Sequence, residues 1–516
     1  MSQTTVIEQP AATSATLPKD ALSTLSIADS NPNTLTNPSR AQAITAVVAL
    51  TGVSFLNTMG SGILTVALPK MATDLGLNHE ILLWPAAVYA LAAGCTLLIF
   101  GSIADVIGDK RVWITGSVLF AFFTLACGLA QTGNQLIAFR TLLGISVAMC
   151  LPCAVSLMTR TFPPGKYRNL GFASMGMGQP LGYSVGLILG GVFADSIGWR
   201  YGYYISAILN ALLSVLAFWS LPREKPKTEP LLQGLKRIDW VGAPIISVSL
   251  ALLSFVLAQI TGSYHSLGDT YIIVLLVIAL VLLPVFVGWV EYQERNGRPA
   301  LIPNSLWKNT VFSATCLIVF FAWAEFNALQ YFTSLYFQEI QHNSALSSSL
   351  MFLPMVIVGV ATNIFTGYMV DKVQVGILVF VSAVISTISP LLMALIKPEW
   401  GYWRGPFMAM ALSPLHPDVL FTVSNLIITR AYPGQNQALA GAVFNSVSQV
   451  GNSVGLAVSA AIAASVTEHS GKTGNDEGTL VGYQAAYWLM FAAMVVVCGV
   501  SWFGLRSGGY VGKKSD

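Results

Sequence analysis

Charged residues are scarce in this sequence. Only 9% of its 516 residues are Asp, Glu, Lys or Arg, and 54% are hydrophobic, whereas a soluble domain carries about 25% charged residues. A surface this apolar would not stay dissolved in water, so the composition excludes a soluble globular protein and indicates lipid as the solvent. The net charge of +3 is too small to indicate nucleic acid as a partner.

The sequence also lacks the motifs of nucleotide and metal chemistry. It contains no G-x-x-x-x-G-K-[ST] phosphate loop and therefore no built-in ATPase. The five histidines are scattered, no H-E-x-x-H occurs, and the six cysteines lie in apolar runs without the second pair that a metal site needs. We therefore predict no catalytic residue, no metal, no cofactor and no enzymatic activity.

Long apolar segments are what the chain has in abundance. A membrane-spanning helix needs about 20 mostly apolar residues. Fourteen segments meet this condition: 44–67, 82–103, 112–131, 136–161, 169–194, 201–221, 240–261, 271–291, 311–337, 346–370, 375–396, 403–429, 436–466 and 482–505. Pro406, Pro414, Pro417 and Asp418 interrupt the twelfth segment. The fold class predicted is an all-α membrane protein with about 14 transmembrane helices.

The distribution of Lys and Arg predicts how these segments cross the bilayer. With the N-terminus in the cytosol, most of the 26 Lys and Arg residues fall in cytosolic tails and loops, as membrane proteins require. The opposite orientation would invert this asymmetry. Both termini are therefore expected in the cytosol, and no cleavable signal peptide precedes the first span.

A short repeat divides the chain into two halves. Gly101-x-x-x-Asp105 follows the second span, and Gly367-x-x-x-Asp371 follows the tenth. The two occupy equivalent places if the seventh and eighth spans are an inserted pair, and repeated halves are a common plan of transporters. The predicted organisation is a disordered cytosolic tail (1–43), a six-helix bundle (44–221), a cytosolic loop (222–239), two inserted helices (240–293), a second loop (294–310), a second six-helix bundle (311–506) and a cytosolic tail (507–516).

The segment from Gly101 to Arg111 resembles the signature loop between helices 2 and 3 of the major facilitator superfamily. In that family the loop is a conformational latch between the halves. The resemblance implies this role for Gly101, Asp105, Gly108, Lys110 and Arg111, and by repetition for Gly367 and Asp371. Asp105 can either cap a helix or pair with a basic side chain. Val106 and Asp109 replace the basic residues that the family usually has.

The fifth span contains a second motif, Gly182-x-x-x-Gly186-Leu187-x-x-Gly190-Gly191, which resembles the antiporter motif of drug exporters. Glycines at this spacing form a smooth face for close helix packing. Leu187 stands where the motif has proline. With fourteen spans, these motifs resemble the fungal branch of the drug:proton antiporters. Many relatives also have an aspartate in the first span, where this chain offers Asn57.

Three ionisable residues lie at membrane depth and are candidates for proton coupling: Glu325, Asp418 and Arg140. Arg140 resembles the family's arginine motif in helix 4, and it either tunes a nearby acid or extends to the outer interface. Each acid is either a proton carrier or a structural group, Glu325 bonded to a neighbouring helix and Asp418 near an interface. The candidates for lining a substrate cavity are Asn57, Gln179, Tyr183, Trp323, Asn327 and Tyr331, with Tyr89 and Asn363 among further polar groups.

The resemblance implies a secondary active transporter that exports a drug or secondary metabolite in exchange for protons, by alternating access. The missing acid in the first span and Leu187 favour an alternative, a facilitator or importer of a small solute such as ammonium or borate. A transport-dead sensor or a membrane enzyme is the third hypothesis. The expected partners are a small organic solute, protons and the lipid bilayer, without nucleic acid. We expect a monomer in the plasma membrane, with the vacuolar or endosomal membrane as alternatives.

Overall fold

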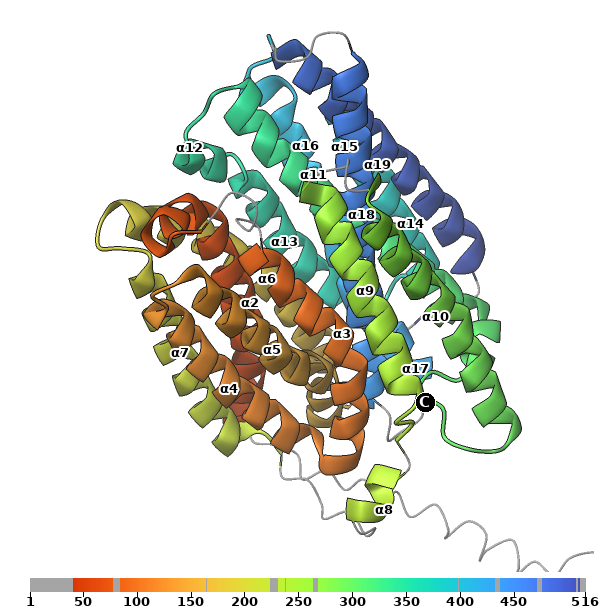
Figure 1. Cartoon of the computed structure of the whole chain (residues 1–516). Coiled ribbons are helices and arrows are strands. Elements are labelled where there is room, and N and C mark those ends of the chain that lie inside the picture. The colour runs from red at the N-terminus through yellow and green to blue at the C-terminus, as the bar shows by residue number, and fades with distance from the viewer. Residues whose placement is uncertain are drawn as a thin grey trace, which may run out of the picture.

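Long helices packed side by side make up most of the described chain (Figure 1). The computed structural model describes residues 40–77, 84–163, 165–222, 231–236, 238–262, 268–397, 399–431, 437–470, 476–506 and 509–510. Within these ranges the chain forms helices and no strand. Most of the predicted tails, and residues 223–230 of the predicted loop 222–239, lie outside the described residues.

Six long helices form the first half. They are α2 (Arg40–Leu75), α3 (Trp84–Ile107), α4 (Asp109–Leu129), α5 (Gly133–Thr161), α6 (Lys166–Asp195) and α7 (Arg200–Ser220). Helix α2 begins four residues before the predicted first span and takes in the end of the predicted tail. The short helix α8 (Leu231–Lys236) and the inserted pair α9 (Gly242–Gly262) and α10 (Thr270–Arg295) follow.

The second half repeats the plan with more interruptions. It contains η3 (Asn304–Lys308), α11 (Thr310–Leu335), the π-helical turn η4 (Tyr336–Ile340), α12 (Ala345–Leu350), α13 (Leu353–Met369), α14 (Val375–Ser386), α15 (Ile388–Ala394), η5 (Tyr402–Arg404), α16 (Pro406–Leu412), α17 (Leu415–Ala431), α18 (Gln437–His469) and α19 (Asp476–Gly504). Three of these breaks lie close to a proline, Pro354, Pro390 or Pro414, whose ring cannot continue a helix without distortion.

Thirteen helices of the described chain are long and apolar enough to cross a membrane. Each corresponds to one of the fourteen predicted spans. The remaining prediction, 403–429, is two shorter helices, α16 and α17, which separate at Ser413 and Pro414. The prediction of an all-α membrane protein is therefore confirmed, and the proline-rich twelfth segment is broken as its sequence indicated.

The hydrophobic core joins the two halves at one end of the molecule only. There, one cluster of buried side chains contains residues of both halves, among them Ala104 of α3 and Leu439 of α18. At the opposite end each half has its own cluster, around Ile63 in the first half and Phe332 in the second. We call the joined end, where α3 terminates beside Asp105, the Asp105 end.

The inserted pair covers the seam between the halves. Helix α9 contacts both α3 and α18 (Figure 1), and the rings of Trp84 and Phe255 lie 5.6 Å apart between α3 and α9. Asp239 fixes the start of the pair, because its Oδ1 accepts hydrogen bonds from the Gly242 backbone N–H (2.7 Å) and from the Trp289 indole (2.9 Å). The pair is therefore part of the packed bundle.

Candidate functional site between the two halves

Asp105 joins the two halves through hydrogen bonds. Its carboxylate, near the end of α3, accepts backbone N–H bonds from Ala438 (3.2 Å) and Leu439 (3.0 Å) of α18. These N–H groups lie in the first turn of α18, where a helix leaves its donors without acceptors of its own. A negative charge is also favoured at this end of the helix dipole. Of the two roles predicted for Asp105, the structure therefore shows the capping role.

The glycines of both repeats lie where one half meets the other. A Cβ atom on Gly101 would lie 2.7 Å from Cβ of Ala442 in α18, and one on Gly367 of α13 would lie 3.0 Å from Cβ of Ala173 in α6. The two repeats thus make reciprocal contacts across the interface. Gly108 has a φ of 117°, a conformation that residues with a side chain rarely adopt.

The charged residues of the predicted latch do not all reach the interface. The Lys110 ammonium donates a 2.6 Å bond to the backbone oxygen of Leu221, where α7 ends within the same half. Arg111 is exposed, and Asp371 is half-buried. The predicted latch therefore separates into Asp105 and the two repeat glycines, which contact the other half, and Lys110, which fixes the first half internally.

Asp109 forms a buried network that the sequence reasoning treated only as a departure from the family motif. It is fully buried, and its Oδ2 accepts bonds from the Ser156 hydroxyl (2.6 Å) and from Nε of Arg160 (2.9 Å). The network ties the start of α4 to the end of α5. The sequence held a signal for it, because Asp109 follows the glycine that ends the second span and Arg160 lies near the end of the fourth, and their charges are opposite.

The predicted helix-packing motif is a close contact between α6 and α2. The motif consists of Gly182, Gly186, Gly190 and Gly191. A Cβ atom on Gly182 would lie 2.2 Å from the backbone oxygen of Phe55, and one on Gly186 would lie 2.2 Å from that of Met59. Real Cβ atoms do not approach so closely, so the two backbones touch only because side chains are absent.

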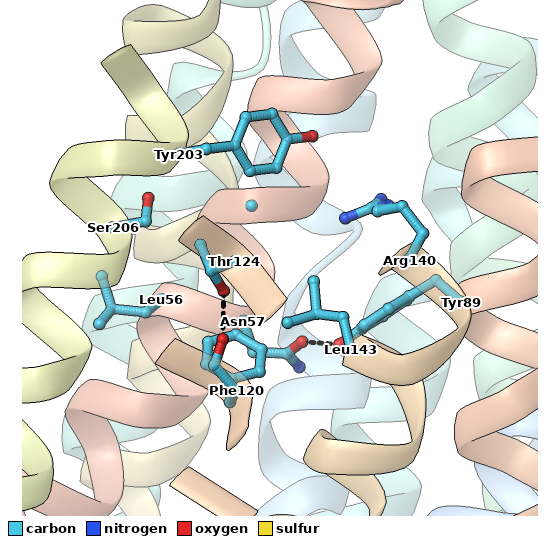
Figure 2. A pocket seen from close by; sticks show the side chains of 10 residues that line it. Leu56, Asn57, Tyr89, Phe120, Thr124, Arg140, Leu143, Tyr203 and Ser206 are labelled. Atoms are coloured by element: carbon cyan, nitrogen blue, oxygen red, sulfur yellow. Dashed lines mark hydrogen bonds between the residues drawn. The ribbon is translucent and has the colours of Figure 1, made fainter. Parts of the chain in front are cut away.

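Arg140 is buried inside the first half, with 2% of its surface exposed. Its Nε donates a 3.1 Å bond to the backbone oxygen of Pro85, and its guanidinium carbon lies 5.0 Å from the centre of the Tyr89 ring. The Tyr89 hydroxyl in turn donates to Oδ1 of Asn57 (Figure 2). The guanidinium therefore points into the protein. No Asp or Glu within the described ranges forms an ion pair with it.

A small cavity adjoins Arg140 (Figure 2). It is lined by Leu56, Asn57, Gly60, Tyr89, Phe120, Thr124, Arg140, Leu143, Tyr203 and Ser206. Its volume of about 10 Å³ is close to the smallest that holds one water molecule. The Tyr203 hydroxyl has no hydrogen-bond partner among the described residues. In this conformation the cavity can hold a water but excludes an organic solute.

Asp418 lies at the interface between the halves. It is 8% exposed in the first turn of α17, and the Asn363 side chain of α13 lies beside its carboxylate. A Cβ atom on Gly359 would lie 2.7 Å from Asp418 Oδ2, and one on Gly176 of α6 would lie 2.3 Å from Asn363 Oδ1. Both oxygens are buried without a hydrogen-bond partner in the described part of the chain. Asn363, together with Phe421 of α17, therefore touches α6 directly, and Asp418 lies beside this contact on the side of the second half.

Glu325, the other candidate acid, lies inside the second half. It is 3% exposed and shares a buried face of α11 with Ala322 and Ala328. The neighbouring residue, Ala324, packs on α18, because a Cβ atom on Gly455 would lie 2.3 Å from its backbone oxygen. Glu325 and Asp418 thus differ in position: only Asp418 is placed where the two halves meet.

The remaining cavity candidates do not form one site. Trp323, Asn327 and Tyr331 follow one another at four-residue spacing, which places them on one face of α11. The Trp323 ring lies 5.6 Å from that of Phe444 in α18, and Tyr331 lines a second cavity within the second half. Gln179 and Tyr183 are half-buried in α6, and of the six candidates only Asn57 adjoins Arg140.

These features define an integral membrane protein of two related helical halves joined at one end. The family model of the Major Facilitator Superfamily matches residues 50–415. "MFS-type transporter 1" of Pyricularia oryzae is 53% identical over 92% of this chain and 85% of its own length. The chain belongs to the Major Facilitator Superfamily, and the predictions of a transporter rather than an enzyme and of membrane integration are confirmed.

More distant relatives carry different names. "Efflux pump terJ" of Aspergillus terreus is 25% identical over 86% of this chain and 85% of its own length. "Low affinity ammonium transporter" of Saccharomyces cerevisiae is 25% identical over 80% of this chain and 78% of its own length. These relatives include both activities that the sequence analysis left open.

A solved structure has the same fold. The human organic anion transporter MFSD10 aligns with a TM-score of 0.60 over 89% of this chain and 97% of its own, at 14% identity. This likeness shows the arrangement of the helices. Together with the family match, it confirms the predicted major facilitator fold.

Proposed function

We propose that this transporter exports a drug-like organic molecule or secondary metabolite in exchange for protons. The single observation that carries the proton step is the position of Asp418, a buried acid between the halves. Alternating access requires the interface between halves to open and close. An acid placed there experiences water in one state and burial in the other, so its proton binding and the conformational change are linked.

We propose that the Asp105 end faces the cytosol, following the distribution of Lys and Arg. The core shared by both halves then closes the cytosolic side, and the separate cores lie on the outer side. The conformation described above is then the one that is closed to the cytosol.

The proton step follows from the surroundings of Asp418. Burying an ionised carboxylate without a cationic partner costs about 3–5 kcal/mol. A proton on Oδ2 removes this charge and gives the group a donor. A neutral Asp418 therefore favours closure of α13 and α17 against α6.

Everted membrane vesicles from cells that express the chain test this function. With an acidified interior, vesicles should accumulate a fluorescent dye such as rhodamine 6G, and the accumulation should cease when the pH gradient is collapsed. Asp418→Asn should abolish the dependence on the gradient, whereas Glu325→Gln should keep it. Asp476→Asn, an exposed acid paired with His342, is the matched control and should transport normally.

Two results would contradict the assignment. If Glu325→Gln removes coupling and Asp418→Asn does not, the carrier is the acid inside the second half. If vesicles containing the wild-type chain accumulate no dye when the gradient is imposed, proton-driven export of such molecules is wrong.

A second candidate function is facilitated movement of a small solute. It is favoured by Asn57 in place of an acid in the first span, by Leu187, and by the name of the ammonium-transporting relative. The cavity beside Arg140 has room for about one water molecule in this conformation, and it must widen to admit even a small solute. Its positive charge, however, opposes ammonium there and suits a neutral or anionic solute such as borate. Uptake of boric acid and of labelled methylammonium into cells that express the chain distinguishes these solutes.

We propose the plasma membrane as the location and a monomer as the working unit. An exporter must discharge its solute outside the cell, and the two halves already contain both sides of the interface that alternates. A fluorescent C-terminal tag tests the membrane, with vacuolar or endosomal signal as the contrary result. Light scattering of the purified protein tests the monomer.

A further inference from the structure

The second half contains a cavity that the arguments above leave without a role. It has a volume of about 520 Å³ and lies between α11, α18 and α19. Ala463 in its wall is 25 residues along α18 from Ala438, roughly 37 Å at the rise of an α-helix. The cavity therefore lies at the end opposite Asp105, and its volume falls within the range of sites for drug-sized molecules.

Aromatic side chains form one wall of this cavity. Tyr331 and Phe332 come from α11 and Tyr483 from α19, and the rings of Phe332 and Tyr483 pack edge to face, with centroids 5.5 Å apart. The faces of such rings carry partial negative charge and attract cations. The rest of the wall is mainly apolar, with Leu335 and several alanines.

Two carboxylates, one in the cavity lining and one beside it, add negative charge to this cavity. Glu468 of α18 lines the cavity. The Tyr483 hydroxyl donates a hydrogen bond to Oε2 of Glu339, in the π-helical turn that follows α11. The bond makes the Tyr483 ring more electron-rich and keeps a second acid next to the wall. No Lys or Arg is among the lining residues within the described chain.

We infer that this cavity binds a bulky organic cation with apolar substituents. Aromatic faces and two carboxylates stabilise positive charge, the apolar wall buries the substituents, and the absence of a basic lining residue disfavours an anion. The inference rests on the proposed function, because a site at this end serves the release of exported cations only if the end faces outward. Binding itself requires no transport.

Equilibrium binding of tetraphenylphosphonium to the purified full-length transporter tests the inference. The neutral analogue triphenylphosphine oxide measures the part of the affinity that is independent of charge. Tetraphenylphosphonium should bind more tightly than the oxide. Glu468→Gln should weaken its binding about threefold, and Glu468→Gln combined with Tyr331→Leu should weaken it roughly tenfold, while binding of the oxide changes little with Glu468→Gln.

Matched variants separate this site from general effects. Tyr331→Phe keeps the ring and should bind like the wild type, and Asp476→Asn removes an acid at the same end that does not line the cavity. Equal affinity for the cation and the oxide, or equal affinity in the wild type and the double variant, overturns the inference. Vesicle transport is measured in parallel. Loss of gradient-driven transport with cation binding intact contradicts the proposed function alone, and the reverse result contradicts this inference alone.

Discussion

Asp105 and Leu439 lie 334 positions apart in the sequence, and a 3.0 Å hydrogen bond joins them. The acceptor belongs to α3 in the first half, and the donor is the first turn of α18 in the second. Asp105 therefore caps α18 only while the two halves are together at this end. The free energy of a helix cap is then part of the free energy of closure, and a single side chain influences the conformational equilibrium.

Replacing Asp105 by Ala should shift that equilibrium toward the state that is open at the Asp105 end. A lost cap costs about 1 kcal/mol, which corresponds to a shift of about fivefold. The measurement is the labelling rate of Ser446→Cys, a nearly isosteric change at a buried position of α18, by a membrane-impermeant maleimide in a background without native cysteines. Labelling from the Asp105 end should become faster.

Asp239→Ala is the control for Asp105→Ala. Asp239 also accepts a backbone N–H bond at a helix start, but its partner Gly242 belongs to the same inserted pair. The substitution should lower thermal stability without changing the labelling of residue 446. Equal acceleration by both substitutions would mean that Asp105 stabilises the fold and not the closed state.

Alanine at Gly182 or Gly186 should destabilise the first half. Each new Cβ atom would meet a backbone oxygen of α2 at 2.2 Å, so α6 must move away or both helices must shift. Overpacking of this kind costs about 1–3 kcal/mol, and the midpoint of thermal unfolding in detergent should fall by several degrees. Gly499→Ala in α19, where a Cβ atom meets nothing within 4 Å, should leave the midpoint unchanged or raise it.

Tyr89 and Asn57 provide a test by a double-mutant cycle. Tyr89→Phe leaves Oδ1 of Asn57 without its donor, and Asn57→Leu leaves the Tyr89 hydroxyl without its acceptor. Each single substitution should cost about 1–3 kcal/mol, whereas removal of both polar groups should cost much less than the sum. Thermal unfolding of the four proteins measures the coupling. Additive losses would show that the bond contributes little.

The helices and their division into halves could be predicted from the sequence because apolar length and the paired Gly-Asp motifs are local signals. Close packing on one face of α6 could also be predicted from its glycines at four-residue spacing, but not that α2 is the partner. The partner of Asp105 could not be predicted, because nothing in the sequence near residue 105 specifies the start of α18. The sequence analysis left that choice open between a helix and a basic residue.

The candidate acids show the same limit. Glu325 and Asp418 look alike in sequence, as single carboxylates in apolar segments. Only the packing distinguishes them, because Asn363, which adjoins Asp418, packs on Gly176 of α6, while Glu325 stays within the second half. The polar cavity candidates were likewise predicted as one set, whereas the structure places Asn57 beside Arg140 and Tyr331 in the cavity between α11, α18 and α19. The other four candidates line neither cavity.

Asp109 and Arg160 should respond unequally to loss of charge. Asp109 is fully buried, whereas 29% of the Arg160 side chain is exposed. Arg160→Gln leaves a buried carboxylate without its cation and should cost about 3–5 kcal/mol. Asp109→Asn leaves an arginine that water can solvate and should cost less, about 1–3 kcal/mol.

Ser156→Ala, which removes one hydrogen bond of 2.6 Å to Asp109, is the control for simple loss of a bond, at about 1 kcal/mol. Thermal unfolding of the three variants should therefore rank Arg160→Gln as the least stable. If Asp109→Asn is the least stable variant instead, leaving Arg160 without its partner costs more stability than leaving the buried carboxylate without its cation. That result would contradict the expected ranking.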